Sequence, residues 1–188
     1  MNIFVLDNDP KLAAREACDK HVVKMIVETA QMLSTAHRYL DGSEYIDKTA
    51  TGRKIKRYRH PDSIQEAKLC KAVMINHPCT KWTMETDSNY YWLHEHGVEL
   101  LLEYKWRYLK THAMSNLFNV HLYKAPSNIK NGKLTQFAQA MPDKYKASDA
   151  VDAYRNYYIG EKAKFARWTC RNIPTWFVEG LTRKASLV

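Results

Sequence analysis

Four polar side chains recur at helical spacing in the stretch CDKHVVKMIVETAQMLSTAHR. The residues are His21, Lys24, Glu28 and Gln31, and a helix would place all four in one row. A carboxylate or an imidazole can act as a general acid or base, and a neighbouring lysine can hold a phosphate. The row therefore predicts a pocket in which Glu28 and His21 carry acid–base chemistry. Lys24 would bind phosphate there, and Gln31 would line the wall.

An ordinary structural role competes with this interpretation. Glu28 follows Lys24 by four residues, which is also the spacing of a surface ion pair on a helix. The surrounding helix is apolar on more than one face, however, and polar groups in such a helix are costly unless they are satisfied or useful. Lys20 adds a further cation at the helix start, where free backbone N–H groups also attract phosphate.

A second group of polar and aromatic side chains lies in the segments NHPCTKW and SNYYWL. Large rings next to His and Lys suit the stacking of a nucleobase whose phosphate is held nearby. We therefore predict a base-stacking or pocket role for four residues, namely His77, Trp82, Asn89 and Tyr90. Each ring taken singly fits a hydrophobic core at least as well.

Basic residues gather between residues 42 and 60, where the apolar periodicity stops. They are Lys48, Arg53, Lys54, Lys56, Arg57 and Arg59. A run of one sign around a glycine predicts an exposed basic loop or arm. Arg53, Lys56 and Arg57 are its candidate phosphate-binding residues, with a merely solvated loop as the alternative.

Several familiar signatures are missing from the chain. There is no Walker motif, no GxGxxG after a strand, no HExxH and no GxSxG. His77 with Cys79 and either His94 or His96 does not have the spacing of a zinc site. The sequence therefore predicts no metal and no cofactor, and it argues against P-loop, Rossmann and zincin enzymes.

The elements that must position these residues are mostly helices. Apolar spacing and capping residues predict a helix that starts near Pro10 and others over residues 19–40, 61–76 and 148–171, with one more that starts after a cap at residues 87–88 and continues to about residue 112. Residues 2–6 favour a short strand, and residues 115–146 favour loops with one helical turn near Gln136. We expect a mainly α, single-domain helical bundle over residues 1–188 with a short N-terminal β-strand. Its C-terminal tail, from about residue 180 to 188, should be flexible.

The net charge and the apolar content limit the kinds of partner that the protein can have. Lys and Arg number 29 against 20 acidic residues among 188, and this excess favours nucleic acid or nucleotides as partners. The four cysteines are scattered without a CxxC pair, so we expect reduced thiols. No stretch has the roughly 18 apolar residues of a membrane span, and no secretory signal precedes the first helix. We therefore expect a cytoplasmic protein without a membrane partner.

The segments FVLDNDP, CDKHVVKMIVETAQMLSTAHR, NHPCTKW, SNYYWL and AYRNYYIGEKAKFARW together resemble a family of small proteins of tailed, T-even-like bacteriophages. The likeness runs from the N-terminus to about Phe177, and the basic arm is its most divergent part. The resemblance implies a phage origin and expression in the cytoplasm of an infected host bacterium. It supplies no catalytic mechanism.

Three hypotheses about function follow. The first is an enzyme acting on nucleic acid or nucleotides, such as a base-modifying or base-excising, glycosylase-like enzyme that flips its target base. The second is a nucleotide-binding counter-defence protein that sequesters or cleaves a small nucleotide signal. The third is a non-catalytic DNA-binding protein. We favour the enzyme by a narrow margin, and a homo-oligomer stays open.

Overall fold

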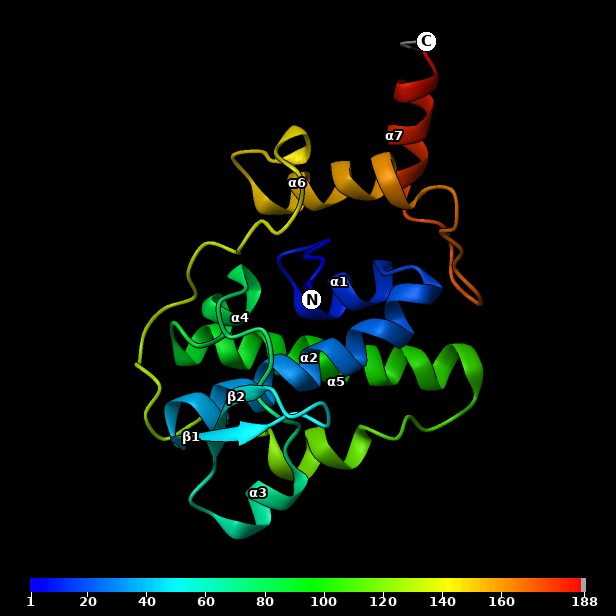
Figure 1. The fold of residues 1–188 in the computed structure, drawn as a ribbon. Helices are drawn as coiled ribbons and strands as arrows, with labels where there is room; N and C mark the ends of the chain where they lie inside the picture. The colour runs from blue at the N-terminus through cyan, green and yellow to red at the C-terminus, as the bar shows by residue number, and fades with distance from the viewer. Residues whose placement is uncertain (187–188) are drawn as a thin grey trace.

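Two long helices form the centre of the protein, whose computed structural model describes residues 1–186 (Figure 1). Helix α2 (Asp19–Leu40) and helix α5 (Asp87–Tyr108) pack against each other, and α1 (Pro10–Glu16) packs on α5. The mainly α prediction is confirmed, and α2 has the predicted bounds because no Gly or Pro interrupts it before Gly42. Within residues 1–186, no helix has both the length and the apolar character that a membrane crossing needs.

Shorter elements surround this pair. They are α3 (Ser63–Lys68), α4 (Pro78–Thr83), α6 (Ala150–Tyr157) and α7 (Thr175–Ala185), with π-helical turns at Leu117–His121 and Tyr158–Lys162 and a 3₁₀ turn at Asp143–Tyr145. Figure 1 shows α6 beside the N-terminal segment, where the Arg155 side chain donates a 2.9 Å hydrogen bond to the carbonyl of Leu6. The C-terminal part of the chain therefore covers the N-terminal segment.

The strand predicted over residues 2–6 is not formed. The φ of Phe4 is 54°, a left-handed conformation that interrupts an extended chain. The Asn2 side chain holds this bend, because its Oδ1 accepts the N–H of Ile3 at 2.8 Å and that of Phe4 at 3.3 Å. The β structure lies instead in the segment predicted as a basic loop or arm.

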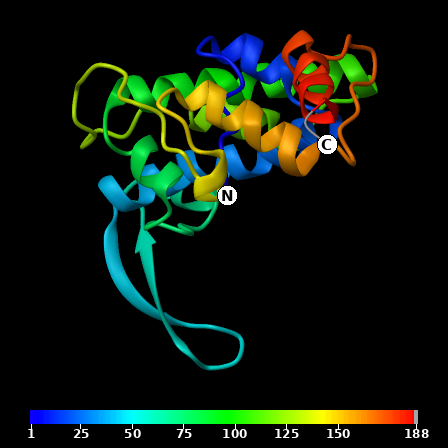
Figure 2. The ribbon, with the colours of Figure 1, turned by 90° about the horizontal axis from the view of Figure 1, so that it is seen from above.

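That segment is an antiparallel hairpin of β1 (Ser43–Lys48) and β2 (Lys54–Arg59), which we call the basic arm. Figure 2 shows it projecting from the helical body. Its side chains are exposed or half-buried on both faces, and its register places Lys48 directly opposite Lys54. Like charges in a cross-strand pair are unfavourable without an anion nearby.

Three predicted helices are wrong in extent. The helix expected to reach about residue 112 spans Asp87–Tyr108, because Leu109 takes a left-handed conformation that ends α5. The helix expected over residues 61–76 ends at Lys68, because the guanidinium of Arg38 binds the carbonyls of Glu66, Leu69 and Cys70, which helix bonds would otherwise use. The helix expected over residues 148–171 ends in the π-helical turn at Lys162.

The prediction near Gln136 also differs from the structure. Residues near Gln136 form no helical turn, and Thr135 instead bonds the side chain of Asn89. Helix α7 reaches Ala185 within the segment predicted as a flexible tail, whose flexibility stays a prediction, and residues 187–188 lie outside the described part of the chain.

The packing of α5 against its neighbours gives a stability prediction. A Cβ added at Gly97 would lie 2.2 Å from Cε1 of Phe118 and 2.9 Å from Cγ2 of Thr29. Gly97→Ala should therefore lower the free energy of unfolding by about 1–3 kcal/mol through overpacking. Urea unfolding followed by tryptophan fluorescence measures the change, and Glu95→Ala on the exposed face of α5 is the control. An unchanged midpoint for Gly97→Ala would contradict the tight packing.

Candidate functional site

A cavity of about 310 Å³ opens where the N-terminal segment lies against α2. Its lining residues are Met1, Asn2, Phe4, Lys20, His21, Lys24, Glu28, Tyr157, Lys162 and Phe165. The first seven come from the N-terminal segment and α2, and the last three come from the end of α6 and the turn that follows it. We call this cavity the Glu28 pocket.

The carboxylate of Glu28 lies in the pocket beside two amines and one backbone N–H. Its Oε2 accepts the backbone N–H of Asn2 at 2.9 Å and lies 3.8 Å from the amino group of Met1. Its Oε1 lies 3.2 Å from Nζ of Lys24. The side chain of Glu28 is 13% exposed, so this negative charge is held in place at the pocket wall beside two amines.

His21 lies in the wall of the same pocket. Its ring is buried, stacks on Phe4 at 4.1 Å between centroids and is hydrogen-bonded through Nδ1 to the hydroxyl of Tyr158. Burial, followed by the positive charges of Lys162 and Lys24, lowers the pKa of His21 to about 3. The imidazole is therefore neutral at pH 7. Its contacts fit a structural wall better than the acid–base role that the sequence suggested.

Aromatic rings paired with cations form the opposite wall. Nζ of Lys20 lies 4.8 Å from the ring centroid of Phe165, and Nζ of Lys162 lies 4.3 Å from that of Tyr157. Lys162 also donates to the hydroxyl of Tyr157 at 3.1 Å. The sequence reasoning missed Tyr157, Lys162 and Phe165 as site residues. The alternation of rings and cations in NYYIGEKAKF was the available signal.

His77 lies close to this pocket without lining it. It caps α4, and its Nδ1 accepts the N–H of Cys79 at 3.2 Å. Burial and the positive amino group of Met1 lower the pKa of His77, whereas the charge of Glu28 acts in the opposite direction. Gln31 is half-buried one turn beyond Glu28 on α2 and is not among the lining residues.

The other predicted stacking residues belong to the core. Trp82, Asn89 and Tyr90 are all buried. The ring of Trp82 packs against Trp92, and the amide of Asn89 donates to the carbonyl of Trp82 at 2.8 Å. The hydroxyl of Tyr90 donates to the carbonyl of Leu122 at 2.9 Å. The three residues are therefore buried in the core and do not line the Glu28 pocket, and their role in stacking a nucleobase stays a prediction.

The predicted phosphate-binding residues of the basic arm differ in their surroundings. Arg53 is exposed near the tip, and Lys56 forms a 2.9 Å ion pair with Glu44 on the neighbouring strand. Arg57 is half-buried and lines a hollow at the root of the arm. In Figure 2 the N-terminus lies at the edge of the helical body from which the arm projects.

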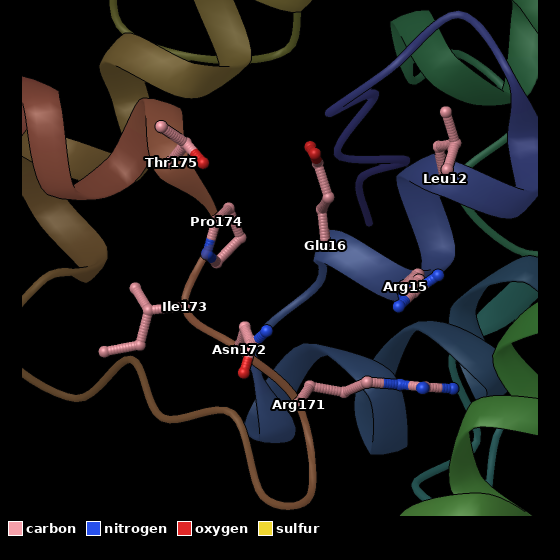
Figure 3. A pocket seen from close by; sticks show the side chains of 8 residues that line it. All are labelled: Leu12, Arg15, Glu16, Arg171, Asn172, Ile173, Pro174 and Thr175. Atoms are coloured by element: carbon pink, nitrogen blue, oxygen red, sulfur yellow. The ribbon is translucent and has the colours of Figure 1, made fainter.

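A second hollow, of about 260 Å³, lies between the end of α1 and residues 171–175 (Figure 3). The carboxylate of Glu16, which lines this hollow, accepts a 2.7 Å hydrogen bond from Nε1 of Trp176, and burial raises the pKa of Glu16. Arg171 at the same hollow is bonded to Glu103 at 2.6 Å. Because these charged groups are already bonded to other side chains, the Glu28 pocket is the better candidate site.

Comparison with known proteins adds one match. The family model described as pyrimidine dimer DNA glycosylase matches residues 1–116. Neither the curated proteins nor the solved structures contain a match. The matched residues include the N-terminal segment, α2 with Glu28, and the basic arm. Tyr157, Lys162 and Phe165 lie beyond the matched residues.

Proposed function

The chain belongs to the pyrimidine dimer DNA glycosylase family, whose model matches 116 of its 188 residues, and on this premise we propose that it excises damaged pyrimidine bases from duplex DNA. The observation that carries the proposal is the Glu28 carboxylate held beside two amines in a pocket with cationic and aromatic walls. These groups match what cleavage of a bond between a base and its sugar requires.

The chemistry follows from the charge that develops on the sugar. When the bond between C1′ and the base nitrogen breaks, the base leaves with the bonding electrons and the sugar becomes positive, as in glycoside hydrolysis. A carboxylate at 13% exposure stabilises that charge, and an amine can attack C1′ to form a covalent intermediate. In our proposal Glu28 stabilises the charged sugar and accepts the proton that the attacking amine releases.

Two amines lie beside Glu28. The amino group at Met1 belongs to a half-buried residue and lies 3.8 Å from the carboxylate, whereas the Lys24 side chain is 68% exposed with its Nζ at 3.2 Å. An uncharged amine is the nucleophilic form, and a sheltered amine is shielded from competing solvent. We propose the amino group at Met1 as the nucleophile and Lys24 as a phosphate contact.

The opposite wall supports recognition of a flipped nucleotide. A base inside a duplex is unreachable, so an enzyme that acts on it must rotate the nucleotide out of the stack into a pocket. Tyr157 and Phe165 supply ring faces, and Lys20 and Lys162 supply charges for the flanking phosphates. A cavity of about 310 Å³ suits a single nucleotide. His21 and Phe4 would position this wall.

The setting of this activity is also a proposal. The resemblance to small proteins of tailed bacteriophages supports an origin in a phage and action on DNA in the cytoplasm of an infected bacterium. Detection of the protein in infected cells, with damaged phage or host DNA as substrate, is the corresponding test.

Trapping on irradiated DNA tests the proposed function. The protein is incubated with ultraviolet-irradiated or untreated duplex oligonucleotides in the presence of cyanoborohydride, which reduces an imine between an amine and the opened sugar. We expect cleavage of the bond between base and sugar, detected as an abasic site that alkali converts into a strand break, and a covalent protein–DNA adduct, both only with irradiated DNA. Peptide mapping should place the adduct on Met1 rather than on Lys24.

Two other outcomes would each contradict part of the proposal. Abasic sites without an adduct would exclude the amine as nucleophile. Absence of abasic sites in irradiated DNA would exclude the excision of damaged pyrimidines.

A further inference from the structure

Three potential metal ligands converge at the root of the basic arm, away from the Glu28 pocket. His37 and Asp41 are four residues apart at the end of α2, and His60 directly follows β2. One ligand atom from each side chain lies within 4.8 Å of those of the other two. Residues that are distant in sequence thus meet at the point where both ends of the hairpin join the helical body.

Hydrogen bonding around His37 leaves one ring nitrogen free. The hydroxyl of Tyr90 donates its single hydrogen to the carbonyl of Leu122 at 2.9 Å. The 2.9 Å contact between this hydroxyl and Nε2 of His37 therefore requires Nε2–H to donate. A neutral imidazole has one N–H, so with Nε2 donating the lone pair of Nδ1 stays available for an ion, and the carbonyl of Lys124 is a further neighbour of the ring. An outer hydrogen bond of this kind is typical of metal-binding histidines.

Asp41 is oriented as a metal-binding carboxylate would be. Its Oδ2 accepts the backbone N–H of Ser127 at 2.8 Å, and its Oδ1 accepts that of Asn128 at 2.9 Å. Each oxygen retains a further lone pair. Within residues 1–186, Asp41 pairs with no lysine or arginine. Its charge is thus left to be neutralised by another cation.

His60 completes the set at the cost of one hydrogen bond. Its Nδ1 accepts the N–H of Asp62 at 3.1 Å. Coordination through Nε2 requires the ring proton on Nδ1, so that bond would open. Asp62 is exposed, and its amide can bond water instead.

We propose that His37, Asp41 and His60 bind a divalent transition-metal ion, with Zn²⁺ as the best fit. Two imidazoles and a carboxylate form the donor set that such ions prefer, and three protein ligands leave a fourth position for water. The ion would join α2 to both ends of the basic arm and so fix the direction in which the arm projects. This site is independent of the proposed glycosylase activity.

Cobalt titration of the metal-stripped, untagged full-length protein tests the site. Tetrahedral Co²⁺ absorbs visible light, and we expect one ion per chain with bands typical of nitrogen and oxygen ligands. His60→Gln and Asp41→Asn should each weaken binding at least about 100-fold, more than the loss of an outer-shell partner costs. His112→Gln, at the half-buried His112 beyond α5, is the matched control and should bind like the wild type.

Thermal unfolding with Zn²⁺ provides a second readout, because a ligand that binds only the folded state raises the midpoint. Zn²⁺ should raise the midpoint of the wild type and of His112→Gln but not that of His60→Gln. The proposal is overturned if the wild type binds neither ion, if His60→Gln binds as tightly as the wild type, or if a sulfur-to-cobalt charge-transfer band shows that a cysteine holds the ion.

Discussion

Glu28→Gln should reduce base excision from irradiated duplex DNA at least about 1,000-fold while DNA affinity changes little. Glutamine keeps the size of the side chain and can accept the N–H of Asn2, which now bonds Oε2 at 2.9 Å. It removes the negative charge that the proposed reaction needs when the sugar becomes positive. The loss should therefore appear in the chemical step and not in binding.

Single-turnover kinetics with excess enzyme measure this step directly, and fluorescence anisotropy at the same salt concentration measures binding. Glu95→Gln makes the same chemical change on the exposed face of α5 and should leave both quantities unchanged. Retention of more than about a tenth of the rate by Glu28→Gln would remove Glu28 from the mechanism, since loss of a catalytic group typically costs far more.

Neutralising the tip of the basic arm should have the second-largest effect. Lys48, Arg53 and Lys54 are exposed there, and Lys48 lies opposite Lys54. Each phosphate contact contributes about 0.9 to the slope of log affinity against log salt concentration. If all three residues contact phosphates, replacing them with glutamine should lower that slope by about 2.7 and weaken binding strongly at low salt.

A second triple variant controls for net charge. Lys105, Lys110 and Lys184 are exposed on or beside α5 and α7, and their replacement with glutamine removes the same charge away from the arm. Titrations of duplex DNA at several salt concentrations give both slopes. Equal slopes for the two triple variants would show that the arm contributes only to the overall charge.

Local signals account for what the sequence predicts well. Helix α2 begins at Asp19 and ends before Asp41 and Gly42 in the structure as in the prediction, because helix propensity and stop signals act over a few residues. The row that contains Lys24 and Glu28 follows from this helix, since the 3.6-residue period alone sets which side chains share a face. The wall of the Glu28 pocket that α2 forms can therefore be predicted from the sequence.

Tertiary contacts account for what the sequence does not predict. Composition cannot distinguish a ring such as Tyr90, which is buried, from Tyr157, which lines the pocket, because both are tyrosines among polar neighbours. The early end of α3 depends on a buried guanidinium from Arg38, 28 residues before Glu66. At Phe4, the bend held by the Asn2 side chain also packs the Phe4 ring against Tyr157, and these contacts override the β propensity of residues 2–6.

The closure of the Glu28 pocket by residues 157–165 has a consequence for the order of folding. The side-chain amide of Asn2 donates a 2.8 Å hydrogen bond to the carbonyl of Ala140, 138 residues further along the chain. Nε1 of Trp168 donates to the carbonyl of Glu16, from which it is separated by 152 residues. During synthesis the N-terminal segment emerges first, yet its partners emerge among the last. The pocket can therefore assemble only after residues 157–165 have been made, so we expect no base excision by a nascent chain that lacks them.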